Sequence, residues 1–200
     1  MKQHYGIIAA VASAFIFGFT AILSKLSYEG GSNGITLTFL RAAFAIPVLF
    51  AVLKIRRVPV AISKKELRDV LMVGIPGPAL TTLLLYGSYH YISVGIATTL
   101  HFMYPVMVTL AGLVFFKDTA GKPKPLALAL GFSGVLLFFE NNSAVGIVGI
   151  LLAFSSSLTY TIYMLGVEKT SLRHINHFKL SLYFCVLSLV MSGLFGAATG

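Results

Sequence analysis

Tyrosine and histidine side chains gather in two neighbouring apolar stretches in the middle of the sequence. In the first stretch, Tyr86 and His90 are four residues apart, so a helix would place them on one face. In the second stretch, His101 is followed by Tyr104. Such groups can bind a small polar molecule or carry a proton, since imidazole titrates near physiological pH. The alternative is that each histidine only bonds a neighbouring backbone carbonyl.

A proline stands close to the second histidine. Pro105 comes four residues after His101, and its ring has no N–H to donate to the His101 carbonyl. The helix can kink there and expose backbone acceptors toward a cavity. Pro105 is therefore predicted to have a gating or structural role.

Hydroxyl and aromatic groups recur near the two ends of the sequence. Ser13 and Phe17 lie in the first apolar stretch, and Ser156 and Tyr160 lie in the sixth. These residues could line the wall of a pocket. In the alternative, the small residues around Ser13 form a close-packing face between helices, and both serines bond back to their own helices.

Arg41 is a charged residue inside an apolar stretch that begins near Ile35. A charge at that depth needs a carboxylate, backbone carbonyls or water as a partner. Glu29 and Glu140 are the plausible acidic partners. Arg41 is therefore either a structural clamp or a residue that contacts an anion or gates access.

The composition indicates which structural elements position these residues. Of the 200 residues, 57% are hydrophobic and only 10% are charged, which excludes a soluble protein. A membrane-spanning helix needs about 20 apolar residues. Runs of this length without alternating polarity indicate helices rather than the strands of a barrel. Seven stretches qualify, at residues 5–27, 35–53, 69–91, 94–116, 124–140, 146–167 and 177–198. The predicted fold class is an all-α integral membrane protein.

Lysine and arginine are distributed unevenly between the two sides of these helices. With the N-terminus placed in the cytoplasm, 13 of the 15 basic residues fall on the cytoplasmic side, and the outer connections carry none. This asymmetry accounts for the net charge of +9 without nucleic acid as a partner. The expected partner is the lipid bilayer, and the expected location is the cell (plasma) membrane, crossed many times.

A weak internal repeat appears at an offset of 143 residues. It places Ser13 opposite Ser156 and Thr38 opposite Ser181. Five helices fit within the offset, and because five is odd, the two copies must face opposite sides of the membrane. Inverted repeats of this kind are typical of secondary transporters, with the substrate site between the copies.

The segment Ser93–Phe139 reads SVGIATTLHFMYPVMVTLAGLVFFKDTAGKPKPLALALGFSGVLLFF. Its small-residue start, mid-helix proline, FFKD turn and glycine-rich helix ending in GVLL resemble the drug/metabolite transporter superfamily, EamA branch. The FLR at Phe39–Arg41 is also similar to that family. Asp118 departs from it, standing where a glutamate is common.

The resemblance implies ten helices in two five-helix repeats, of which this chain would hold about seven. Residues 1–143 would form the first repeat, and residues 144–200 would begin the second. The implied function is secondary transport of small metabolites such as amino acids or drug-like compounds, most readily as an exporter, by alternating access. The alternative is a truncated, non-transporting membrane protein that assembles with a partner or, as a homodimer, with a second copy.

Enzymatic activity is not expected, because the motifs that would support it are missing. The sequence has no GxxxxGK[ST] or HExxH motif. His174 and His177 form an HxxH pair, but without the carboxylates or cysteines that would complete a metal site. The sequence therefore predicts neither a cofactor nor a metal, and a small-molecule substrate is the expected ligand.

Overall fold

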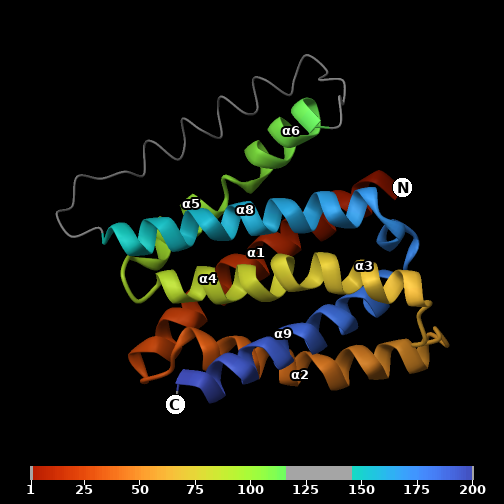
Figure 1. The fold of residues 1–200 in the computed structure, drawn as a ribbon, viewed down its shortest axis with the longest axis horizontal. Helices are drawn as coiled ribbons and strands as arrows, with labels where there is room; N and C mark the ends of the chain where they lie inside the picture. Colours follow the sequence, from red (N-terminus) through yellow and green to blue (C-terminus); the bar gives the residue numbers. More distant parts are fainter. Residues whose placement is uncertain (1, 116–145, 200) are drawn as a thin grey trace.

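The computed structural model describes residues 2–115 and 146–199, and the elements below lie within these ranges. The elements are α1 (Lys2–Glu29), α2 (Gly34–Ile55), α3 (Lys64–Gly74), the π-helical turn η1 (Ile75–Ala79), α4 (Leu80–Ser88), α5 (Val94–His101), α6 (Tyr104–Phe115), α8 (Ile147–Lys169), the 3-10 turn η2 (Ser171–His174) and α9 (His177–Thr199). Figure 1 shows them as a bundle of long helices. The chain is an all-α membrane protein, as its composition predicts.

Six helical segments in the described residues are long and apolar enough to cross a membrane. They are Gly6–Glu29, Gly34–Ile55, Lys64–Ser88, Val94–Phe115, Ile147–Lys169 and His177–Ala198. Each corresponds to one of the predicted stretches. The predicted stretch 124–140 and the predicted repeat boundary at residues 143–144 lie outside the described residues.

The third span begins and ends earlier than hydropathy predicts. It starts at Lys64 because Ser63 and Glu66 form a capping box: the Ser63 Oγ accepts from the Glu66 N–H at 3.2 Å, and the Glu66 carboxylate accepts from the Ser63 N–H at 2.6 Å. Hydropathy marks the apolar run, whereas the cap marks the helix start. At the other end the helix stops at Ser88, so His90 lies in the turn that follows.

Two of the spans are broken near their middles. In the third span, Gly77 has ψ −112°, between Pro76 and Pro78, and this separates α3 from α4. In the fourth span, the chain turns at Phe102 and Met103, directly before Tyr104 and Pro105. Proline removes a helical hydrogen bond and clashes with the preceding turn, which accounts for both breaks.

Helices at corresponding places near the two ends of the chain run in opposite directions. In Figure 1, α1 runs from right to left and α8 from left to right, while α2 runs from left to right and α9 from right to left. In the described residues, α9 packs extensively against α2, and α8 packs against α4, α5, α6 and η1. This arrangement is the one expected of inverted repeats.

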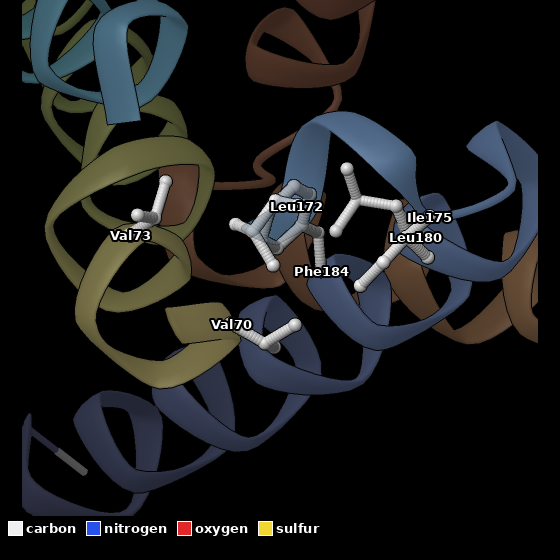
Figure 2. Close-up of a cluster of buried hydrophobic side chains, with 6 residues drawn as sticks. All are labelled: Val70, Val73, Leu172, Ile175, Leu180 and Phe184. Carbon is white, nitrogen blue, oxygen red and sulfur yellow. The ribbon is translucent and has the colours of Figure 1, made fainter. Parts of the chain in front are cut away.

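The ends of α2 and α8 and the starts of α3 and α9 meet at one end of the bundle, called the basic end here (Figure 1). It carries Lys54, Arg56, Lys64, Lys65, Arg68, Lys169, Arg173 and Lys179. Beneath these charges lies a hydrophobic cluster, the basic-end cluster, shown in Figure 2. Its members come from α3, the η2 region and α9: Val70, Val73, Leu172, Ile175, Leu180 and Phe184.

A polar contact joins the same elements beside the basic-end cluster. The buried Asp69 carboxylate accepts hydrogen bonds from Ser171, at 2.6 Å from its hydroxyl and 3.3 Å from its N–H. Asp69 also lies 3.6 Å from the Arg68 guanidinium. The start of α3 is therefore tied to the α8–α9 connection by both apolar packing and hydrogen bonds.

Candidate functional site

A small cavity of about 110 Å³ lies between α1, α2, α4, α5 and α8. It brings together five residues that the sequence singled out: Phe17, Arg41, Tyr86, His101 and Tyr160. The rest of its lining is Thr20, Ala21, Thr81, Thr82, Leu85 and Tyr89. Residues from five separate predicted helices thus meet at one place.

His101 is the centre of the polar contacts at this cavity. It is buried, and its Nδ1 lies 3.0 Å from the Ser156 Oγ of α8. The Ser156 hydroxyl also lies 2.6 Å from the Ala153 carbonyl, to which it donates. Since that hydroxyl proton goes to the carbonyl, the Ser156 oxygen can accept from a protonated Nδ1. Ser156 therefore bonds back to its own helix and also contacts the histidine, but it does not itself line either cavity.

Aromatic rings surround the histidine. The Tyr160 ring is 5.3 Å from the imidazole, and the Tyr104 ring is 5.6 Å from it. Tyr104 and Tyr160 themselves meet edge to face at 4.4 Å, and Phe17 of α1 contacts Phe102 at 5.4 Å. Such ring pairs hold the wall of the cavity in a defined geometry.

A larger cavity of about 620 Å³ lies between α2, the break at η1 and α9. Its lining mixes hydroxyl groups with apolar and aromatic side chains: Thr38, Leu40, Arg41, Ala42, Phe44, Ala45, Pro78, Thr82, Tyr163, Ser181, Phe184, Cys185 and Ser188. Arg41 and Thr82 line both cavities. Cavities of this size and character suit small organic ligands.

Arg41 occupies the junction of the two cavities. Its guanidinium lies over the Tyr86 ring, 5.4 Å from the ring centroid. Glu29, one of its predicted acidic partners, instead lies 3.9 Å from Lys25 one turn away on α1. The other predicted partner, Glu140, is outside the described residues. The structure therefore gives Arg41 an aromatic contact in place of Glu29.

Three of the predicted residues lie apart from both cavities. Ser13, His90 and Pro105 are exposed. Because the helix ends at Ser88, His90 does not share a helical face with Tyr86. Its ring instead lies 6.3 Å from the Tyr28 ring and 6.0 Å from the Tyr91 ring. Pro105 follows the break in the fourth span, has no N–H to donate to the His101 carbonyl, and lines neither cavity.

Several lining residues were missed from the sequence. One of them, Thr81, shares a hydrogen bond of 2.7 Å with Thr159 that joins α4 to α8 beside the small cavity. Thr82 and Tyr163 lie close to the break at Gly77, where a Cβ would come within 2.7 Å of the Tyr163 Cβ. The signal available in the sequence was the Pro76-Gly77-Pro78 run inside an apolar stretch, because interrupted helices mark binding sites in transporters.

Tyr89 adds a phenol to the small cavity from the turn after α4. Burial raises its pKa, the neighbouring Tyr28 adds to the rise, and Arg41 opposes it. The hydroxyl therefore keeps its proton at neutral pH and remains a hydrogen-bond donor. In the described part of the chain, no three histidine, cysteine or acidic side chains are close enough together to hold a metal ion.

The fold and the cavities together define a multi-pass membrane protein in which broken helices border cavities with mixed polar and apolar linings. A family comparison gives this class a more specific identity. The model of the EamA-like transporter family matches residues 4–140, and the chain belongs to that family.

One curated relative is an uncharacterized transporter of Archaeoglobus fulgidus. It is 28% identical to this chain over 157 residues, which cover 78% of the chain and 54% of the relative. The chain thus spans about half the length of this relative. No solved structure matches the chain. The family and the relative's name point to a transporter rather than an enzyme.

Proposed function

We propose that this protein is a secondary transporter of the plasma membrane that exports small metabolites, such as amino acids or drug-like compounds, by alternating access. The observation that carries the proposal is the pair of adjoining cavities, whose walls come from α1, α2, η1, α4 and α5 on one side and from α8 and α9 on the other. Family membership supports transport as the function.

The closed basic end supports the alternating-access part of the proposal. The basic-end cluster and the Asp69–Ser171 contact join α3 to the η2 region and α9 between the larger cavity and the basic residues. Phe184 belongs to that cluster and also lines the larger cavity. Movement of α8 and α9 against α2 and α3 would open this end, as in other transporters built from opposed repeats.

The direct test is solute flux in liposomes that contain the purified protein. Vesicles loaded with labelled amino acids or amphipathic drugs are expected to release them faster than protein-free vesicles. Loading and orientation controls show the direction of transport, and membrane fractionation of cells tests the plasma-membrane location. Absence of flux for every solute class contradicts the proposal and favours the alternative of a non-transporting protein that works with a partner or a second copy.

A pair of threonine variants tests whether the cavities are the path. Thr82 lines both cavities, so Thr82→Trp is expected to fill them and abolish flux. Thr36 is exposed near the start of α2 and lines neither cavity, so Thr36→Trp is the matched control and should retain flux. Equal flux in the two variants would place the path elsewhere.

A further inference from the structure

Arg41 carries a full charge deep in the second span. It lies seven residues after the helix start at Gly34, which corresponds to roughly 10 Å along the axis at the usual helical rise. From there its side chain reaches the junction of the two cavities and is accessible in both. Its position is therefore that of a ligand-contacting group.

The charge of Arg41 has no carboxylate partner within the described residues. Its contact there is the face of the Tyr86 ring, and Glu29 is paired with Lys25. Neither cavity lining contains aspartate, glutamate or lysine. Because an uncompensated charge within a membrane is costly, the site favours a ligand that brings the missing negative charge.

The chemistry around Arg41 narrows the kind of anion. A guanidinium presents two parallel N–H donors that match a carboxylate. The adjoining walls offer a hydroxyl group from Ser181 and rings from Tyr163 and Phe184. A phosphate dianion would leave its second charge without a partner in this lining. In a monocarboxylate with an apolar body, the single charge matches Arg41 and the body matches the aromatic rings.

We propose that the two cavities select small organic monocarboxylates with an apolar or aromatic body, and that Arg41 binds the carboxylate. This inference rests on the proposed transport function and specifies its substrate class. Arg41 is then a specificity-determining residue rather than a structural clamp.

The absence of tryptophan from the sequence allows a direct binding test. Indole-3-acetate, indole-3-acetamide and tryptamine have similar shapes but carry negative, zero and positive charge at neutral pH. Their own indole fluorescence can be followed on titration with the protein in lipid nanodiscs, with empty nanodiscs as the blank. The acetate is expected to bind tighter than the other two by about tenfold or more, which corresponds to about 1.4 kcal/mol.

Variants at one position connect that preference to the guanidinium. Arg41→Gln is expected to abolish the preference for the acetate, and Arg41→Lys to retain part of it, since it keeps the charge but loses the planar fork. Lys25→Gln, which removes an exposed charge already paired with Glu29, is the control and should bind like the wild type. Melting curves show whether each variant is folded.

The outcomes separate this inference from the function on which it rests. Equal binding of the three probes by the wild type, no binding of any of them, or a folded Arg41→Gln variant that keeps the preference would overturn the carboxylate assignment. The wild-type comparison decides this even if Arg41→Gln does not fold. Flux of solutes without any acetate preference would refute the substrate class but leave the transporter, whereas Arg41-dependent acetate binding without flux would refute transport but leave the anion site.

Discussion

The basic-end cluster and the two cavities lie side by side in the bundle but are formed by different kinds of side chain. At the cluster, α3, the η2 region and α9 meet through buried aliphatic groups and one aromatic ring, with Asp69 satisfied by Ser171. At the cavities, α2, α4, α8 and α9 face one another through hydroxyl groups, rings and Arg41. Packing fills the first region and leaves space in the second.

This difference shows how the same helices can be held together at one place and leave room for a ligand at another. Close packing gains dispersion contacts and leaves no room for a ligand. A cavity lacks those contacts, so the side chains that line it remain able to bind a ligand. Phe184 belongs to both regions, so it is the residue through which a ligand in the larger cavity would touch the closed end.

The largest expected effect comes from emptying the cluster. Leu172 is 1% exposed, and Leu172→Ala should lower the free energy of unfolding by about 2–5 kcal/mol, because it removes apolar contacts and leaves a cavity. The melting temperature in detergent measures this. Leu158→Ala, at a side chain that is 45% exposed, is the control. Equal melting temperatures in the two variants would contradict the role assigned to the cluster.

A smaller loss is expected at the junction between the regions. Gly77→Ala would place a Cβ about 2.7 Å from the Tyr163 Cβ, so α8 must shift at an estimated cost of about 1–3 kcal/mol. Flux should fall as well, because Tyr163 lines the larger cavity. Gly95→Ala has open space around its Cβ and should keep the wild-type melting temperature and flux. If Gly77→Ala had the same melting temperature and flux as Gly95→Ala, the close contact between Gly77 and Tyr163 would not matter for stability or transport.

The smallest effect on stability is expected within the cavity region. Ser156→Ala removes the partner of His101 and should cost about 1 kcal/mol of unfolding free energy. It should reduce flux more clearly than stability, since the imidazole can then rotate. His90→Ala, at an exposed histidine outside both cavities, should leave flux and melting unchanged. If His90→Ala reduced flux while Ser156→Ala did not, the cavity assignment would be wrong.

Hydropathy accounted for the spans and Pro105 for a kink in the fourth span, but the break at Gly77 was not predicted. Six predicted stretches correspond to observed candidate spans, because a membrane demands long apolar helices whatever their neighbours are. The capping box at Ser63 and Glu66 and the Pro76-Gly77-Pro78 run are also local, and both were readable but overlooked. Ser13 shows the opposite case: its repeat position matches Ser156, yet it is exposed while Ser156 is buried.

Membrane class, helix positions and the concentration of charge at one end follow from composition and local sequence, because each depends on transferring short segments between water and lipid. The partners of the polar groups do not follow from composition or local sequence. His101 meets Ser156 from 55 residues away, and Arg41 lies over Tyr86 rather than beside Glu29. Those contacts depend on how far each helix is rotated about its axis and where the broken spans bend, which only the packing of all the helices together decides.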